Sequence, residues 1–457
     1  MFKKILIANR GEIAVRIIRA CRELGIQTVA VYSTADQEAM HTQLADEAIC
    51  IGPSKAIDSY LNMQNILSAA VLTQAQAIHP GFGFLSENST FASMCEEMNI
   101  TFIGPDKETI DQMGNKAHAR KLMKAANVPV VPGSEGFLED ETDVVKNASE
   151  ISYPLMLKAA AGGGGKGMRV VQNETELMPA FHSAQSEAQA AFGDGRMYME
   201  KIIKPAKHIE VQLLADHFGN VIHLGERDCS MQRHHQKVIE ESPAVLLSES
   251  QRKAIGDAAV RAGEYVGYKN AGTVEFLVDQ SGDFYFMEMN TRIQVEHPIT
   301  EMVTGIDIVK EQLRIASGEP LSVRQSEIIF NGHAIECRIN AENPLVNFAP
   351  SPGKISYLLL PSGGLGLRVD SALFAESEIP PYYDAMVAKV ITHGKNREEA
   401  IAKMKRALGE MVIEGIQTNQ DFQMDLLDDL NFRSGDYYTT YLEDEFIEKW
   451  LVAKDEE

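Results

Sequence analysis

The sequence has few cysteines, and those it has are scattered. Cys21, Cys50, Cys95, Cys229 and Cys337 form no C-x-x-C pair in 457 residues. An odd number of widely spaced cysteines argues against a disulfide framework and against a zinc ribbon. It favours a reducing compartment, so we expect a cytoplasmic protein.

Long apolar runs and an excess of positive charge are also missing. No window approaches the roughly 18 uninterrupted apolar residues of a membrane span. The 65 Asp and Glu residues outnumber the 43 Lys and Arg residues, and the net charge is −22. Such a surface repels nucleic acid and anionic membranes, so neither is expected as a partner. An anionic substrate must therefore be held by local clusters of Lys, Arg and backbone N–H groups.

The length and the pattern along the chain predict several domains. Over the first ~110 residues, strand-like runs alternate with helical periodicity, which predicts a parallel, Rossmann-like sheet. The strand-like runs are 3–8, 28–32, 75–78 and 100–103. Gly11 stands alone, and 79–86 lacks the third glycine of G-x-G-x-x-G. A scaffold is therefore favoured over a dinucleotide site here.

From Phe330 onward the pattern changes to short strands separated by Pro and Gly turns. One helix, at about 396–414, interrupts them. This pattern predicts a small antiparallel-sheet domain at the C-terminal end. The fold class is thus α/β followed by α+β.

A glycine-rich loop joins two strand-like runs, 153–158 and 168–171. The loop reads Ala161-Gly-Gly-Gly-Gly-Lys-Gly167 and is not a P-loop, because it fails G-x-x-x-x-G-K-[ST] and no helix follows. Adjacent glycines expose N–H groups and adopt positive φ without steric cost, so the loop can close over phosphates. An ordinary hairpin tip is the alternative. Lys158 before the loop, Lys166 within it and Lys116 upstream favour phosphate binding.

Five polar residues occupy alternate positions late in the chain: Glu288, Asn290, Arg292, Gln294 and Glu296. If this segment is extended, they share one face. Desolvating such a row is unfavourable unless a ligand binds it. The row predicts a divalent cation at its carboxylate end and a small anion at its arginine.

A hairpin is expected to bring a second carboxylate to this row. The runs 273–278 and 284–289 flank Gln280-Ser-Gly-Asp283, and a turn centred on Ser281-Gly282 places Glu275 opposite Glu288. Facing carboxylates repel, which Mg²⁺ between them would relieve, with Asn290 as a third oxygen ligand. Two glutamates tolerated on a wet face are the alternative. An odd loop length would shift the register.

Three further stretches carry weaker signals. Residues 199–203 end a strand-like run and, from the residues alone, read as an ordinary strand. Residues 232–237 are rich in donors, and His235 and Lys237 are candidate phosphate contacts. Cys229 with His234 and His235 matches no standard zinc spacing. Arg338 alternates with Glu336 on a strand, where a surface salt bridge is the plain interpretation.

Several of these motifs are long and specific. They are Ile7-Ala-Asn-Arg-Gly-Glu-Ile-Ala14, His79-Pro-Gly-Phe-Gly-Phe-Leu-Ser-Glu-Asn88, the glycine loop, Arg227-Asp-Cys-Ser-Met-Gln-Arg233 and Glu288–His297. Together they resemble the biotin carboxylase family of ATP-grasp enzymes over about residues 1–446. The resemblance implies a Rossmann-like domain at 1–112, an ATP-grasp domain at 113–318 with a mobile lid at 131–203, and a C-terminal domain at 330–446.

The resemblance also assigns residues. It implies ATP contacts at Lys116, Lys158, Gly163, Gly164, Gly165, Lys166, Gly167, Glu200, Lys201, Ile202, Ile203, His208, His235, Glu275 and Glu288. It implies two Mg²⁺ (or Mn²⁺) ions held by Glu275, Glu288 and Asn290. It implies a bicarbonate site at Lys237, Arg292, Gln294 and the backbone of Val295. Lys237 and Arg292 count as catalytic, Glu296 is the implied base, and Arg338 would stabilise the biotin enolate.

The implied reaction uses ATP and bicarbonate to form carboxyphosphate, and then carboxylates biotin on a separate carrier. The length resembles the stand-alone subunit of a bacterial acetyl-CoA carboxylase, which supplies malonyl-CoA for fatty acid synthesis. The implied partners are a biotin carboxyl carrier protein, carboxyltransferase subunits and a second copy of the chain. The dimer contact would lie between a helix near Arg19 and Glu23 and the stretch 363–368.

The sequence departs from the family pattern at four positions: Ala161, Lys166, His234 and Leu365. None of them removes a catalytic group, but Leu365 replaces a larger aromatic at the implied dimer contact. Three alternatives stay open: another ATP-grasp ligase, the carboxylase of another biotin enzyme such as pyruvate carboxylase, and a nucleotide sensor without catalysis. The biotin-attachment string Ala-Met-Lys-Met is missing, and Ala402-Lys-Met-Lys405 has the wrong order.

Overall fold

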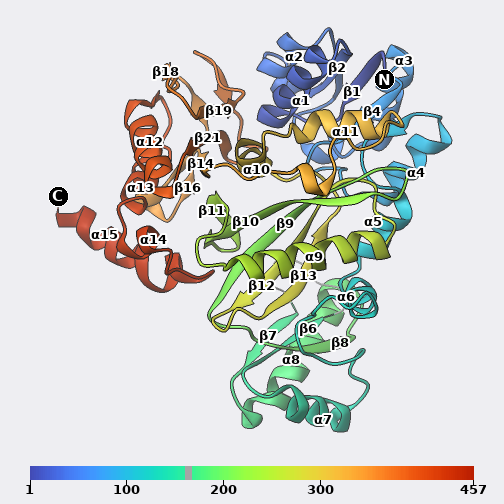
Figure 1. The fold of residues 1–457 in the computed structure, drawn as a ribbon, viewed down its shortest axis with the longest axis vertical. Coiled ribbons are helices and arrows are strands. Elements are labelled where there is room, and N and C mark those ends of the chain that lie inside the picture. Colours follow the sequence, from blue (N-terminus) through green and yellow to red (C-terminus); the bar gives the residue numbers. More distant parts are fainter. Residues whose placement is uncertain (160–166, 457) are drawn as a thin grey trace.

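A computed structural model describes residues 1–159 and 167–456. Residues from the first strand to Phe102 build a five-stranded parallel sheet in the order β3-β2-β1-β4-β5 (Figure 1). Its strands are β1 (Lys4–Ile7), β2 (Gln27–Ser33), β3 (Glu47–Gly52), β4 (Ala77–His79) and β5 (Thr101–Phe102), and the helices of this region are α1 (Gly11–Glu23), α2 (Met40–Leu44), α3 (Met63–Thr73), α4 (Ser89–Glu97) and α5 (Lys107–Gly114). The expected β-α-β alternation is confirmed, because apolar runs such as 5–7 are buried within the layered core.

A smaller unit projects from the rest of the molecule, as Figure 1 shows at its lower end. Its three-stranded antiparallel sheet has the order β7-β6-β8 and packs against two helices through a separate apolar cluster. The elements are α7 (Glu141–Ile151), β6 (Leu155–Ala159), β7 (Met168–Val171), α8 (Glu174–Phe192) and β8 (Met197–Lys201), preceded by α6 (Lys116–Ala125). The expected strand, loop, strand order around the glycines is present, with Lys158 paired to Met168.

The centre of the molecule is an eight-stranded sheet in the order β13-β12-β9-β10-β11-β14-β21-β19. Its elements and the nearby helices are β9 (Ala206–Ala215), β10 (Val221–Arg233), β11 (Gln236–Ser242), α9 (Glu249–Tyr265), β12 (Asn270–Asp279), β13 (Phe284–Asn290), α10 (His297–Thr304), α11 (Ile308–Ala316), β14 (His333–Asn340), β19 (Leu367–Ser371) and β21 (Met386–Gly394). The helix α9 packs against β9 and β10. The C-terminal strands β14, β21 and β19 extend this sheet, so the antiparallel C-terminal part is continuous with the centre.

The remainder of the C-terminal region closes over its own apolar cluster. It comprises β15 (Glu342–Asn343), β16 (Ala349–Pro350), β17 (Gly353–Lys354), β18 (Tyr357–Leu359), β20 (Glu378–Ile379), α12 (Arg397–Glu410), β22 (Val412–Glu414), α13 (Gln420–Leu426), α14 (Leu430–Ser434) and α15 (Ile447–Glu456). The expected helix near 396–414 is present, but α13, α14 and α15 were not predicted. They are short, so few apolar repeats mark them. Among the described residues no helix is long and apolar enough to cross a membrane.

The hairpin of β12 and β13 reaches the predicted pairing by a different route. Its turn spans Asp279–Asp283, and Val278 pairs with Phe284, one register step away from the prediction. A bulge between the pairs of Phe276 and Glu275 then takes up one extra residue, and Glu275 faces Glu288. The loop is odd in length, and the bulge restores the register that the odd loop shifts.

Candidate active site

The row of alternating polar residues is only partly extended. The strand β13 ends at Asn290, residues 291–296 are irregular, and Glu296 is the N-cap of α10. The predicted continuous strand is therefore wrong beyond Asn290, because the chain turns there to enter the helix. The side chains still meet: Arg292 Nη2 donates to Asn290 Oδ1 at 2.9 Å, and Gln294 Nε2 donates to Glu275 Oε1 at 2.8 Å.

Lys237 on β11 connects this row to the sheet. Its Nζ lies 2.5 Å from Glu210 Oε2, 3.2 Å from Glu275 Oε1 and 2.5 Å from Glu296 Oε1. Burial alone would lower the pKa of Lys237, but the three carboxylates raise it well above its ordinary value. The ammonium group is therefore charged at neutral pH, and together with Arg227 and Arg338 it lets the buried carboxylates share one site.

Glu296 lies between two cationic side chains. Lys237 contacts one oxygen, and Arg338 Nη2 donates to the other at 3.0 Å. Burial opposes ionisation of Glu296, yet Lys237, Arg338 and Arg227 hold its pKa well below the ordinary value. Arg338 is largely buried, and its Nε donates to Glu240 Oε1 at 2.5 Å. It is thus part of this site, and its interpretation as a surface salt bridge is wrong.

The expected metal ligands lie at the other end of the row. Glu275 faces Glu288 across the hairpin, and Asn290 Nδ2 donates to Glu275 Oε1 at 2.7 Å. Glu288 Oε2 lies 2.9 Å from Lys116 Nζ, and Glu275 Oε2 lies 3.1 Å from His208 Nε2. Two opposed carboxylates with an amide beside them form an oxygen-rich donor set, and this set fits Mg²⁺ or Mn²⁺.

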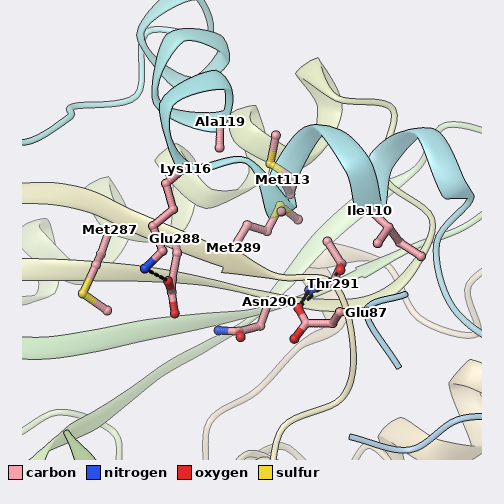
Figure 2. Close-up of a pocket in the computed structure, with 11 residues that line it drawn as sticks. Glu87, Ile110, Met113, Lys116, Ala119, Met287, Glu288, Met289, Asn290 and Thr291 are labelled. Atoms are coloured by element: carbon pink, nitrogen blue, oxygen red, sulfur yellow. Dashed lines mark hydrogen bonds and ion pairs between the residues drawn. The ribbon is translucent and has the colours of Figure 1, made fainter. Parts of the chain in front are cut away.

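A cavity of about 210 Å³ adjoins this end of the row (Figure 2). Side chains from α5 and α6 face residues of β13 across it. The polar lining consists of Glu87, Lys116, Glu288, Asn290 and Thr291, and the apolar lining includes Ile110, Met113, Ala119, Met287 and Met289. The cavity therefore combines an apolar wall with carboxylates and one lysine.

The three-stranded unit brings further predicted residues toward the site. Lys158 on β6 forms an ion pair with Glu200 on β8. The N–H groups of Lys201 and Ile202 are used within the protein, by Pro132 O at 2.7 Å and Pro154 O at 3.1 Å. Ile203 follows in the irregular segment after the end of β8.

The predicted glycine-loop contacts are only partly described. Gly163, Gly164, Gly165 and Lys166 lie outside the described residues. Gly167 has φ +73°, and its N–H donates to Glu187 Oε2 at 3.0 Å. A side chain at this position would meet the Ala159 Cβ at 2.7 Å, so both the conformation and the close approach require glycine.

The two predicted histidines differ in their environment. His208 on β9 is buried beside Glu275, and its Nδ1 lies 2.7 Å from Gln232 Nε2. His235 is exposed in the turn between β10 and β11 and has φ +63°. The structure therefore brings His208 into the polar cluster and leaves His235 at its edge.

Sequence reasoning missed three residues of the site. Arg227 is fully buried, and its guanidinium donates to Glu210, on the neighbouring strand, and to Gln294. Glu87 accepts from Arg292 Nε at 2.9 Å and from the Thr291 N–H at 3.1 Å. For Glu210 and Arg227, inside β9 and β10, the available signal was a charged residue within an apolar stretch, because an unpaired charge is not tolerated in a buried strand.

The fold and the site together define an ATP-grasp ligase. The family model described as "Carbamoyl-phosphate synthase L chain, ATP binding domain" matches residues 115–324. The models "Biotin carboxylase, N-terminal domain" and "Biotin carboxylase C-terminal domain" match residues 1–110 and 336–444. The chain belongs to the biotin carboxylase family.

Relatives support this over nearly the whole length. Biotin carboxylase 1 of Bacillus subtilis is 60% identical over 444 residues, which is 97% of this chain and 98% of that protein. One of the pyruvate carboxylase subunits of Methanothermobacter thermautotrophicus is 53% identical, covering 97% of this chain and 90% of that one. The biotin carboxylase domain dimer of 2-oxoglutarate carboxylase from Hydrogenobacter thermophilus, solved with MgADP, ADP and bicarbonate, has a TM-score of 0.91 and 52% identity, covering 97% and 98%.

Proposed function

We propose that this chain uses ATP and bicarbonate to carboxylate biotin carried by a separate protein. One observation carries the proposal: Glu296 lies between Lys237 and Arg338. Lys237 also contacts Glu275, which belongs to the predicted metal end of the row. Glu296 thus lies between the predicted ATP and metal region and Arg338, the arginine that would bind biotin.

The first step requires a base. Bicarbonate is a poor nucleophile, and its oxygen attacks the γ-phosphorus of ATP as its proton passes to Glu296. The P–O bond to ADP breaks, and carboxyphosphate forms. A bound bicarbonate that takes hydrogen bonds from Lys237 and Arg292 would draw Lys237 away from Glu296. The pKa of Glu296 then rises, so the carboxylate becomes a stronger base when its substrate is present.

Charge on the transferred phosphoryl group is offset from several sides. Lys116 on α6 and Lys158 on β6 would supply positive charge, and the glycine loop would supply backbone N–H groups. Glu275, Glu288 and Asn290 would hold Mg²⁺ or Mn²⁺ (two ions, as the family implies). When bound, the metal supplies positive charge that favours departure of ADP.

In the second step carboxyphosphate splits into CO₂ and phosphate, the released phosphate takes the N1 proton of biotin, and N1 then attacks CO₂ to give carboxybiotin. Arg338 would stabilise the negative oxygen of the biotin enolate by charge-assisted hydrogen bonds. Its Nη2 reaches Glu296 here, so it lies within one side chain of the base. The predicted carrier is a biotin carboxyl carrier protein, and carboxyltransferase subunits would use the product.

We assign the chain to an acetyl-CoA carboxylase in the cytoplasm, with malonyl-CoA for fatty acids as the product of the complex. A pyruvate or 2-oxoglutarate carboxylase is the second candidate, since similar chains carry those names. A homodimer is also proposed, supported by the dimeric relative and by Leu365, which is 90% exposed in the predicted contact.

The decisive experiment is a steady-state assay of ATP consumption with Mg²⁺. Adding bicarbonate and free biotin together should raise ADP and phosphate release above the rate with either one alone. Equal rates with and without biotin would reject the proposal. Repeating the assay with carrier proteins from the candidate complexes would separate the acetyl-CoA, pyruvate and 2-oxoglutarate assignments.

The base is tested by Glu296→Ala. We expect kcat to fall by about 10²- to 10⁴-fold, because general base catalysis contributes this much, with a smaller change in the KM for ATP. Glu264→Ala, at an exposed position of α9, is the matched control and should retain full turnover. Unchanged turnover in Glu296→Ala would remove Glu296 from this role.

A further inference from the structure

Two buried carboxylates face each other behind the proposed biotin arginine. Glu240 on β11 pairs directly with Glu336 on β14, and both side chains have 0% exposure. Directly opposite side chains have Cβ atoms about 5 Å apart, where like charges repel. Two unshielded negative charges at this separation in a dry interior are strongly unfavourable. At least one member of the pair must therefore be neutral.

Hydrogen-bond partners distinguish the two groups. Glu240 Oε1 accepts from Arg338 Nε at 2.5 Å. Glu240 Oε2 and both oxygens of Glu336 are buried and have no hydrogen-bond partner among the described residues. An ionised carboxylate only accepts hydrogen bonds and needs donors around it, whereas a protonated carboxyl group has an O–H that can donate. Glu240 is therefore suited to the charged form and Glu336 to the neutral form.

The other charged groups around the pair are already engaged. Lys389 on β21 donates to Val295 O at 2.7 Å and lies 3.2 Å from Glu12 of α1. Lys237 and Glu296 complete the set, and they contact each other. Glu336 thus lies opposite Glu240 in the strand pairing, and Glu240 Oε2 is a buried acceptor that needs a donor.

We propose that Glu336 is a neutral carboxylic acid that donates its proton to Glu240, and that this pair anchors the Nε edge of Arg338. Both glutamates would be positioning residues for the biotin site, which makes the inference rest on the proposed function. With Nε of Arg338 bound to Glu240, its Nη2 can donate to Glu296 or to a ligand that displaces Glu296.

Charge effects agree with this assignment. Burial raises the pKa of Glu336 well above its ordinary value, and Lys389 offsets this only in part. Burial raises the pKa of Glu240 to about 7, although Arg338 opposes the shift. As the pH falls through about 7, Glu240 takes up a proton and the Nε edge of Arg338 loses its anionic partner, while Nη2 still contacts Glu296. The kcat/KM for biotin should therefore decline on this acid side.

The test compares pH profiles of kcat/KM for biotin in four variants. Glu240→Gln should lower kcat/KM by about 10- to 100-fold, as expected for loss of a charged hydrogen bond. It should also remove the decline of kcat/KM below about pH 7, which we call the acid limb. Glu336→Leu removes the donor at similar volume, so the limb should move to higher pH. Glu336→Gln keeps a donor and should restore the wild-type limb. Cys337→Ala, on the opposite face of β14, is the control and should leave the limb in place.

A second measurement does not depend on turnover. The infrared spectrum of the wild-type protein near pH 8 should contain a carboxylic-acid C=O band that is lost in Glu336→Gln and kept in Cys337→Ala. Absence of that band would overturn the inference even if the biotin-dependent activity is present. If the band is found but no variant responds to biotin, the proposed function fails and the protonated pair stands. Equal limb shifts in Glu336→Leu and Glu336→Gln would also overturn the inference.

Discussion

At the scale of single residues, Arg227 shows how a buried charge can organise a site. Its guanidinium is fully buried and donates to Glu210, Gln212, Thr300, Thr273 and Gln294. Through Glu210 it is connected to Lys237, and through Gln294 to Glu275. These bonds fix the carboxylates and amides that surround the proposed bicarbonate position, so Arg227 acts on the site without having to touch a substrate.

Replacing this arginine should affect stability before chemistry. Arg227→Met leaves Glu210 with Lys237 as its only Lys or Arg partner within ion-pair distance among the described residues. Removing one partner of a buried pair costs roughly 3–5 kcal/mol, so we expect a loss near the lower end of that range. Urea denaturation would measure it. Arg324→Met, which breaks an exposed pair with Glu327, is the control and should change little. A variant as stable as wild type would show that the network is not structural.

The sequence largely predicted which residues gather near the site, but it did not predict the path of the backbone that brings them together. The alternation from Glu288 to Glu296 indicated a cation beside an anion, and the structure brings those side chains together. The same alternation predicted a strand through Glu296, whereas the chain leaves the sheet after Asn290. Period-two spacing and an irregular segment that keeps the same contacts cannot be distinguished in one sequence. Glu210 and Arg227 were missed because no local spacing connects residues on separate strands.

At the scale of elements, the β12–β13 hairpin sets the distance between the two metal-end glutamates. The turn alone would not oppose Glu275 and Glu288, and the bulge is what brings them opposite each other. A sequence shows turn residues but rarely shows a bulge, so the correct pairing was predicted with an incorrect turn. Long periodic elements such as α1 were predictable, whereas α13 and α14 were too short to leave a periodic signal.

The hairpin predicts a specific response to metal. Glu288→Gln keeps the size of the side chain and removes one of the two opposed charges. We expect the Mg²⁺ concentration for half-maximal ATP turnover to rise by about 10- to 100-fold, comparable to the loss of a supporting ligand group. Tyr285→Phe, on the same strand but outside the cavity lining, is the matched control and should need the same Mg²⁺ as wild type. An unchanged Mg²⁺ requirement in Glu288→Gln would exclude Glu288 as a ligand.

At the scale of the whole molecule, the fold accommodates buried carboxyl groups in two opposite ways: some are ionised and others are neutral. Some buried carboxylates are ionised beside cations: burial opposes ionisation of Asp370, but Arg368 lowers its pKa to about 2. The ion pair stabilises the fold fully above the pKa of Asp370 in the unfolded chain, about 4. This stabilisation is lost as the pH falls from there toward the folded pKa of about 2. Glu336 behaves in the opposite sense, because its folded pKa is raised. Some buried carboxyl groups thus make the folded protein more stable at neutral pH than at acid pH, and others make it less stable.

Glu336 therefore makes a measurable prediction for the stability of the whole chain. Above about pH 4.5 the unfolded chain releases this proton and the folded protein keeps it, so folding loses up to about 1.4 kcal/mol per pH unit. Glu336→Gln removes this loss. The thermal midpoint of the variant should match wild type near pH 5 and exceed it increasingly toward pH 8. Glu378→Gln, at an exposed position of β20, should run parallel to wild type throughout. Parallel curves for Glu336→Gln would mean that Glu336 is ionised in the folded protein, and the proton shared with Glu240 would then not exist.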